Sequence, residues 1–586
     1  MGIADLLRDL PKSVSFPLDP SRLSIADHHD LEQYGGLVLP PTPLRGLILQ
    51  AFAEFVYPQL PVVNLGQLID TIDSNAQNAS EPVSLVLFQA IMFAGVACIP
   101  VEQLKRHGWS SHFEARRQLF NRVEACFHVS VHHRLCDPVS LIQSLVLMTL
   151  WYDPGRDQRR DSHHWMRIAL NLAGDIGMLH PRAHSSHPHD PARERLWRRI
   201  AWTMYARDRI IQLGARRPAL IHPNDFTLAP LSIDDFELQP LLYRRPSCLP
   251  AECTLFRDPC QLFNMAEIII EQIGLLRHID EVWTAHEQLK SSISRGSAAS
   301  TVLACDARLK AKWTEFLRHE VPTHLENQQQ KSAMVQRAVL KLLCNTTISA
   351  LHRPLVLRES HGPQPQLDRR ILQQCHATLE DATRQITGVA SLMLENDLWL
   401  CLPASVVASL LSALIVHIIS TKATSEDVRN ASLRGFHQCL RLLARLRSRH
   451  ANADDTYRFL EGTIMSMRNS SEPESFEVKE LANLLEQTSN EQSNTKSLVN
   501  AGLPEPDSSF MMTAEDDGSM FQWLSNDNML PESPLSDFEL LPSTAMAQET
   551  AFPDMYSLFD DQMAQPSRDD SSLQDYDFLQ LISQQV

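Results

Sequence analysis

Metal binding is the first chemistry that the sequence suggests, because histidines gather between residues 180 and 190. The run HPRAHSSHPHD offers four imidazoles and one carboxylate, from His180, His184, His187, His189 and Asp190. Such groups could converge on zinc or nickel. Prolines interrupt the run, however, and nothing prearranges its side chains. A solvated loop between two helices is therefore the favoured interpretation.

The cysteines are a weaker metal candidate. Only three of them lie near one another, and their spacing fits no zinc module well: Cys248, Cys253 and Cys260. The total of 11 is odd, and no pattern of close pairs suggests a disulfide framework. The cysteines therefore predict reduced thiols in an intracellular protein. We expect no metal site and no cofactor.

Catalytic motifs are not found, since the sequence contains no GxGxxG, GxxxxGK[ST], GxSxG or HExxH pattern. Asp208 is the most notable carboxylate because it approaches the apolar face of a predicted helix. A half-buried carboxylate needs a partner, which Arg199, Arg209 or the pair Arg216–Arg217 could supply. A structural ion pair is favoured over a catalytic acid, because no nucleophile or base accompanies Asp208. We expect that the protein is not an enzyme.

Four arginines share one face of a predicted helix, at spacings of seven and then four residues: Arg434, Arg441, Arg445 and Arg449. A solvated face is the favoured interpretation. Two alternatives are contact with nucleic-acid phosphates and docking of an acidic segment of the same chain. The first lacks interleaved aromatic residues, and the second would be weakened by salt.

Charge is distributed very unevenly along the 586 residues, whose formal net charge is −17. Residues 491–586 contain 18 acidic and two basic residues, a net charge of −16. The remaining 52 acidic and 51 basic residues nearly cancel, with a net charge of −1. This distribution excludes a uniformly basic nucleic-acid binder. Only 19 residues are glycine, which argues against a doubly wound α/β enzyme.

Three uncharged stretches, at residues 83–101, 139–152 and 398–421, are candidates for membrane spans or for buried helices. The longest contains a proline, three serines and a histidine, and no basic cluster flanks it closely. A large helical domain also needs fully apolar central helices. Burial in a protein core is favoured, and we expect no membrane segment.

Helical periodicity dominates from residue 44 onward and strand-like alternation is rare, which predicts an all-α fold. Two apolar stripes show the pattern: Leu196, Ile200, Met204 and Ile211, then Leu433, Phe436, Leu440 and Leu443. We divide the chain into a linker-like segment (residues 1–40), a large helical domain (41–485) and a tail (486–586). The tail is polar and acidic and should be disordered by itself.

Several segments in a fixed order resemble the fungal-specific transcription factor regulatory domain, also called the middle homology region. They are LPPTPLRGLILQAFAEFVYPQLPVVN (39–64), IALNLAGDIGMLHP (168–181), ERLWRRIAWTMYARDR (194–209), RRPALIHPNDF (216–226) and LHRPL (351–355), followed by the helix around Cys375. The sequence is similar to the branch that includes the cutinase transcription factors. The resemblance implies an all-α regulatory domain in a nuclear protein that controls a metabolic or secondary-metabolite gene cluster.

The residues that carry the resemblance have a structural interpretation. Trp197, Trp202 and Tyr205 supply large core side chains, and Asp208 and Arg209 fit a buried ion pair. The family pattern continues with Arg217 and Pro218.

The sequence departs from the family at its beginning. Such regulators usually start with a zinc binuclear cluster, in which cysteines alternate with Lys and Arg. Here no cysteine precedes Cys98, and only Arg8, Lys12 and Arg22 are basic among the first 40 residues. We therefore expect no autonomous DNA-binding module. Either a separate DNA-binding protein supplies it, or the chain is an N-terminally truncated zinc-cluster factor; zinc would be a cofactor only in the second case.

Aromatic and aliphatic residues are interleaved with acids in the tail. The clusters are Phe521, Trp523 and Leu524; Leu535, Phe538, Leu540 and Leu541; Met555, Tyr556, Leu558 and Phe559; and Tyr576, Phe578, Leu579, Leu581 and Ile582. Acidic surroundings keep such anchors solvated, and each cluster could fold as a short helix in a coactivator groove. The alternative is a tail that only increases solubility.

These features predict a transcription regulator, and more specifically an activator, that contacts the coactivator machinery. A homodimer is compatible with this role. The less favoured alternative is an all-helical enzyme or small-molecule binding protein.

Overall fold

The computed structural model describes residues 3–73, 81–153, 160–180, 190–215, 218–291, 295–316, 331–358, 369–470 and 476–500. The chain divides into two units, one of residues 1–492 with 568–586 and one of residues 493–567. Of the second unit, only residues 493–500 are described, and they belong to the last helix. The account below therefore concerns the first unit.

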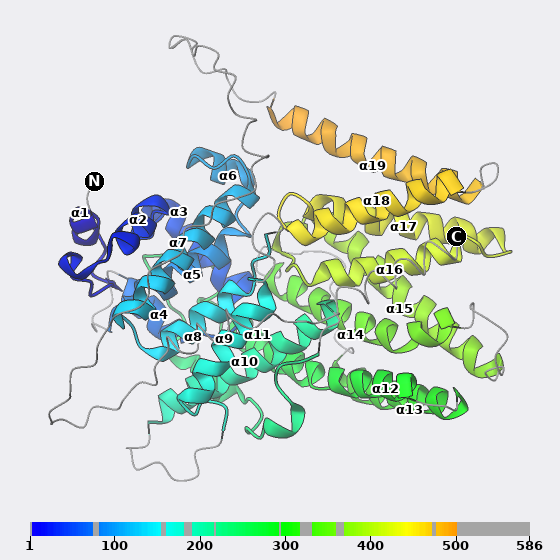
Figure 1. The fold of residues 1–586 in the computed structure, drawn as a ribbon, viewed down its shortest axis with the longest axis horizontal. Coiled ribbons are helices and arrows are strands. Elements are labelled where there is room, and N and C mark those ends of the chain that lie inside the picture. Colours follow the sequence, from blue (N-terminus) through cyan, green and yellow to red (C-terminus); the bar gives the residue numbers. More distant parts are fainter. Residues whose placement is uncertain are drawn as a thin grey trace, which may run out of the picture. The chain divides into compact units, whose positions relative to one another are not determined.

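The first half of the chain consists of helices and one very small sheet (Figure 1). The label η marks 3₁₀ turns, except that η2 is a π-helical turn that continues α3. The elements are α1 (Ile3–Arg8), β1 (Val14–Ser15), η1 (Pro20–Arg22), α2 (Ile25–Gln33), α3 (Thr42–Ala51), η2 (Phe52–Val56), α4 (Leu65–Ile72), β2 (Val83–Ser84), α5 (Leu85–Val96), α6 (Val101–Arg106), α7 (His112–His133), α8 (Pro138–Met148), α9 (Ser162–Asp175) and α10 (Pro191–Ala215).

The second half contains longer helices. Its elements are η3 (Pro223–Asp225), η4 (Ile233–Phe236), η5 (Gln239–Leu241), α11 (Pro259–Leu276), α12 (Ile279–Ser291), α13 (Arg295–Phe316), α14 (Lys331–Arg358), α15 (Arg369–Glu395), η8 (Trp399–Cys401), α16 (Val406–Ser420), α17 (Glu426–Leu446), α18 (Ala451–Ser470) and α19 (Phe476–Asn500). Among the described residues, strands are limited to β1 and β2, which pair in parallel. The predicted all-α fold is confirmed.

Helix α5 forms the centre of the first half. All twelve of its residues are buried, and it packs against α3, α7 and α8. Gly95 allows α3 to approach closely, because a Cβ at this position would lie 2.5 Å from the Ile48 carbonyl oxygen. The uncharged stretch at residues 83–101 is therefore a core helix, as expected from its lack of a polar face.

The second half has a similarly apolar helix, α16, which packs between α15 and α17. Helix α14 packs most extensively against α15, and α17 continues to α18 (Figure 1). Of the helices within the described ranges, none is both long enough and apolar enough to cross a membrane.

Residues 3–40, for which a linker was expected, are packed against the body of the first half. Helix α2 begins with a capping box between Ser24 and Asp27, and Leu31 is buried. The Asp27 carboxylate pairs with His133 of α7, at 3.1 Å. The following turn is held by Gln89 of α5, whose side-chain amide donates to the Gly36 carbonyl at 2.8 Å. The packed body therefore begins well before residue 41.

Candidate functional site

Helix α10 carries the segment that most resembles the regulatory family. Its first turn is capped by Asp190, whose carboxylate accepts from the backbone N–H groups of Ala192 and Arg193 at 3.1 and 3.3 Å. Pro191 at the first helical position suits this start, because that N–H would have no partner within the helix. The apolar stripe then buries Ile200 and Met204 completely. A cap and a 3.6-residue period thus explain why this segment is a buried helix.

The three aromatic residues of α10 lie in the core, at 3–6% exposure. The indole N–H of Trp202 donates to the Ala229 carbonyl at 2.7 Å. Trp202 and Tyr205 both pack on Phe226, with ring centres 4.7 and 4.8 Å from it. Trp197 lies beneath the guanidinium of Arg193, whose central carbon is 4.6 Å from the ring centre. These contacts join α10 to the segment that follows it.

Asp208 and Arg209 form a buried charge network. Their side chains pair at 2.7 Å, and each is at most 1% exposed. The Asp208 carboxylate also accepts from the backbone N–H groups of Leu220 and Ile221 at 3.0 and 2.9 Å. Burial raises the pKa of Asp208, although those two N–H groups and the charge of Arg209 act in the opposite direction.

Arg209 has a second carboxylate partner that the sequence did not indicate. Its Nε lies 2.8 Å from Asp280 of α12, and another of its nitrogens donates to the Ile221 carbonyl at 2.7 Å. Asp280 in turn accepts from the Tyr205 hydroxyl at 2.6 Å. Arg209 therefore holds α10, the loop after it and α12 together.

Arg199, another buried cation of α10, contacts backbone carbonyls instead of a carboxylate. It donates to Pro61 at 2.9 Å, to Val63 at 2.7 Å and to Asp235 at 2.5 Å. Arg199 was considered as a partner of Asp208 but serves this different role. Pro218 lies in the loop after α10, and Arg217 lies outside the described residues.

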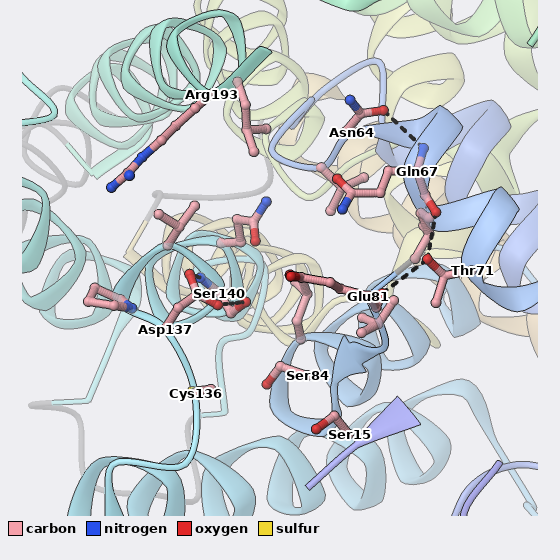
Figure 2. Close-up of a pocket in the computed structure, with 18 of the residues that line it drawn as sticks. Ser15, Asn64, Gln67, Thr71, Glu81, Ser84, Cys136, Asp137, Ser140 and Arg193 are labelled. Atoms are coloured by element: carbon pink, nitrogen blue, oxygen red, sulfur yellow. Dashed lines mark hydrogen bonds between the residues drawn. The ribbon is translucent and has the colours of Figure 1, made fainter. Parts of the chain in front are cut away.

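A pocket of about 740 Å³ lies beside the first turns of α10. Figure 2 shows its lining, to which α4, the segment around β2, α8 and α10 contribute. Trp197 belongs to this lining, so the signature helix forms one side of the pocket. The volume is in the range of small-molecule sites.

The lining of the pocket is rich in hydroxyl and amide groups (Figure 2). On α4, the Thr71 hydroxyl lies 2.9 Å from the Gln67 carbonyl oxygen and 3.3 Å from that of Glu81. On α8, Asp137 caps the helix by accepting from the backbone N–H and the hydroxyl of Ser140, at 3.1 and 2.6 Å. These groups are suited to hydrogen-bonding a polar molecule.

The pocket offers little for catalysis. Among the described residues that line it there is no histidine or lysine. Burial raises the pKa of the Cys136 thiol to about 12, so this thiol is protonated at neutral pH. Asp137 is already engaged as a helix cap. No nucleophile with an adjacent base is found in the lining, so the less favoured alternative of an all-helical enzyme gains no support from it.

The other candidates from the sequence are dispersed. Of the histidine run, residues 181–189 lie outside the described ranges, and Asp190 caps α10. Cys253 is buried and Cys260 is exposed. Within the described ranges, the single group with metal-ligand geometry is Asp27, His132 and His133, whose ligand atoms lie within 4.8 Å of one another. Ion pairs between α2 and α7 account for this arrangement.

The arginine stripe is not a continuous exposed face. Arg434, Arg441 and Arg445 are exposed on α17, and Arg441 pairs with Glu491 of α19 at 3.4 Å. Arg449 follows the end of α17 and is only 3% exposed. The interpretation as a solvated face is therefore wrong for Arg449, because the chain turns at Leu446 and directs this side chain inward.

All predicted coactivator anchors lie outside the described residues: Phe521, Trp523, Leu524, Phe538, Leu541, Tyr556, Phe559, Tyr576, Phe578 and Leu579.

Comparison with known proteins supports the resemblance. Residues 49–321 match the fungal specific transcription factor domain. Cutinase transcription factor 1 beta of Fusarium vanettenii is 32% identical over 76% of this chain and 52% of its own length. Transcription factor cpaR of Aspergillus oryzae is 25% identical over 77% of this chain and 76% of its own length.

A shorter match is the fusaric acid cluster transcription factor FUB12 of Gibberella moniliformis, which is 25% identical over 32% of this chain and 26% of its own length. The chain thus spans about half the length of the cutinase factor. No solved structure matches the chain. The relatives named here are transcription factors and not enzymes. The domain match, which includes α10, and the similarity to these regulators together show that residues 49–321 are similar to the fungal specific transcription factor domain.

Proposed function

We propose that this protein is a nuclear transcription regulator, acting as an activator of a fungal metabolic or secondary-metabolite gene cluster. The observation that carries the proposal is the domain match across residues 49–321, which includes the buried signature of α10. The names of the relatives refer to cutinase regulation and to a fusaric acid cluster, which supports control of metabolic genes.

Activation is assigned to residues 486–586. Their net acidity and their interleaved aromatic residues are typical of segments that bind coactivators through short helices. The affinity of each cluster should be modest because folding on binding costs free energy, and several clusters compensate by acting together. The partners would be coactivators and a DNA-bound protein; a zinc-cluster module encoded in frame upstream of residue 1 is the alternative source of DNA binding. Neither requires a cofactor in the helical body.

A reporter assay tests activation directly. Residues 487–586 are fused to a foreign DNA-binding domain, and we expect reporter output that falls when Trp523, Phe538, Phe559 and Phe578 are replaced by alanine. A matched control replaces Ser525, Ser536, Ser557 and Ser572 by alanine in the same four regions and should keep its output. A fusion without output would contradict the activator role, as would equal output from the two variants.

Target control is tested in the organism. Deleting the gene should reduce transcripts of a contiguous set of metabolic genes, and the intact gene should restore them. Unchanged transcripts under conditions in which the protein is expressed would contradict the proposal. Reading the genomic DNA upstream of residue 1 distinguishes the two routes to DNA, because an in-frame cluster of cysteines would indicate a direct one.

The pocket beside α10 favours a second, compatible role in binding a small polar effector. Its size and its hydroxyl and amide groups carry this proposal. A panel of sugars, polyols and amino acids should contain a compound that raises the melting temperature of the full chain. Replacing Gln67 by tryptophan would fill the pocket and should abolish that shift. A shift that survives this substitution would place the effector elsewhere, and a panel without any shift would contradict the role for these classes.

A further inference from the structure

An excess of buried positive charge lies where α7 meets the turn between α17 and α18, beside the end of α5. Arg116 is 4% exposed and Arg449 is 3% exposed. Among the described residues, the hydrogen-bond partners of the two guanidinium groups are carbonyls, a histidine and a thiol, and none of them is a carboxylate. A buried cation without a counter-ion is costly, so the groups around these two arginines need a physical explanation.

Arg116 is satisfied mainly by neutral acceptors. It donates to the carbonyls of Arg449 and Leu150 at 2.9 and 2.8 Å, and its guanidinium carbon lies 5.2 Å from the ring centre of Trp151. Burial and the neighbouring charge of Arg449 lower the pKa of Arg116 to about 9, which leaves it charged at neutral pH. No carboxylate is among the groups that act on this charge.

Two histidines in the same cluster add no negative charge. Burial lowers the pKa of His112 to about 4 and that of His450 well below its usual value. His112 faces the Ile99 carbonyl at 2.8 Å, and His450 faces the Leu402 carbonyl at 3.2 Å. Both rings are thus neutral donors at neutral pH. Two carboxylates affect pKa values in the cluster, but neither acts on the two arginines. Glu102 raises the pKa of His112, and Glu54 raises the pKa of Cys401.

Cys98 is the side chain that accepts a hydrogen bond from the Arg449 guanidinium. One terminal nitrogen of Arg449 donates to the Cys98 sulfur at 3.6 Å, whereas its Nε and its other terminal nitrogen have no hydrogen-bond partner within the described part of the chain. The Cys401 thiol hydrogen-bonds to Cys98, across more than 300 positions of sequence. A thiolate at Cys98, with Cys401 as the protonated donor, supplies the missing negative charge.

The pKa shifts of the two thiols agree with a thiolate at Cys98 and a protonated thiol at Cys401. The hydrogen bond from Cys401 and the charges of Arg449 and Arg116 lower the pKa of Cys98 to about 7, although burial opposes them. The same pairing raises the pKa of Cys401 well above its usual range. In contrast, burial raises the pKa of Cys439, another core thiol, to about 12. Thiolates are the reactive form of cysteine, so Cys98 differs from the other core thiols in the direction that favours reaction.

We propose that Cys98 and Cys401 form an oxidant-reactive site, in which the Cys98 thiolate reduces a hydroperoxide and Cys401 then closes a disulfide. The Cys98 sulfur attacks one oxygen of hydrogen peroxide, the O–O bond breaks, and hydroxide leaves while a sulfenic acid forms. The Cys401 sulfur then displaces the hydroxyl group from Cys98 and loses its proton, which leaves with that group as water. Cys98 is buried and Cys401 is only partly buried, so a small oxidant would approach from the side of Cys401. The disulfide would link the end of α5 to η8.

The test uses the full reduced chain. After treatment with a small excess of hydrogen peroxide, remaining thiols are blocked and the chain is digested without reduction for mass spectrometry. We expect a peptide that links Cys98 to Cys401, with Cys439 still reduced, and reversal by dithiothreitol. In Cys401→Ser, Cys98 should accumulate as a sulfenic acid that dimedone labels. Absence of the linked peptide, or equal oxidation of Cys439, would overturn the proposal.

The role of the arginines has its own measurement. Arg449→Met should slow the alkylation of Cys98 by iodoacetamide at pH 7 about 10-fold, because a thiol with a usual pKa near 8.5 is only a few per cent thiolate at this pH. Since this variant removes a buried side chain and could unfold, the pH dependence of alkylation is also measured on the native wild-type chain. We expect a midpoint near pH 7 for Cys98. A midpoint above pH 8.5 would refute thiolate stabilisation by the arginines.

Discussion

Replacing Arg209 by methionine should lower the free energy of unfolding by about 3–5 kcal/mol, the usual cost of removing one partner from a buried ion pair. The Arg209 side chain is fully buried and contacts two carboxylates, Asp208 at 2.7 Å and Asp280 at 2.8 Å. Methionine keeps most of the apolar stem but leaves both carboxylates without their cation. The loss is a large fraction of the roughly 5–15 kcal/mol by which a domain is stable.

Urea unfolding of the full chain, followed by far-UV circular dichroism, measures this loss. The matched control is Arg384→Met on α15, since Arg384 forms an exposed ion pair with Asp381 at 2.9 Å. Exposed pairs contribute about 0–1 kcal/mol, so the control should unfold almost like the wild type. A loss below about 1 kcal/mol for Arg209→Met would refute the assignment of a buried, stabilising cation.

A double variant and a pH series sharpen the test. Asp208→Asn removes a charge that Arg209→Met leaves unpaired, so the double variant should be less destabilised than the sum of the two single variants. Burial raises the pKa of Asp208. The charged form is therefore disfavoured in the fold, and the stability deficit of Arg209→Met should shrink as pH falls from 7 through this raised pKa. Additive effects, or a deficit that grows on acidification, would contradict the reasoning.

Further substitutions test the packing of the domain. Gly95→Ala should destabilise the chain by about 1–3 kcal/mol in urea unfolding because its Cβ would meet a backbone oxygen at 2.5 Å, whereas Gly388→Ala, which meets nothing within 4 Å, should be neutral or stabilising. Burial would raise the pKa of Asp27, but hydrogen bonds from Ser24 and His133 outweigh it and lower the pKa to about 2. Its contribution is therefore present above the unfolded value near 3.9 and is lost as pH falls toward 2, so Asp27→Asn should destabilise the chain at pH 6 and make little difference at pH 2. Trp202→Phe should cost about 1–3 kcal/mol, measured in the same way, because the acceptor at Ala229 is left without its donor. Equal unfolding of the two glycine variants, a constant cost of Asp27→Asn across pH, or a neutral Trp202→Phe would contradict the respective contact.

The sequence by itself determined the helical character of the body and the location of its most apolar helices. The absence of charge at residues 83–101 and 398–421 indicated buried segments, and α5 and α16 lie there. Helical periodicity placed the aromatic residues of α10 in the core. Such patterns depend on neighbours three and four residues apart, so they are visible in a single segment. The order of short motifs indicated the family, and charge counting separated the acidic tail.

Only the tertiary structure decided which distant side chains meet. Asp280 joins Arg209 and Tyr205 from another helix, and Cys98 meets Cys401 and Arg449 from segments far along the chain. Residues 3–40 pack because α2 finds a partner on α7 and the turn after it finds one on α5, which no local pattern reveals. The pocket beside α10 likewise arises from the crossing of several helices. Periodicity reports which face of a helix is buried, but the identity of the covering element depends on how the helices pack, and that information is spread over the whole chain.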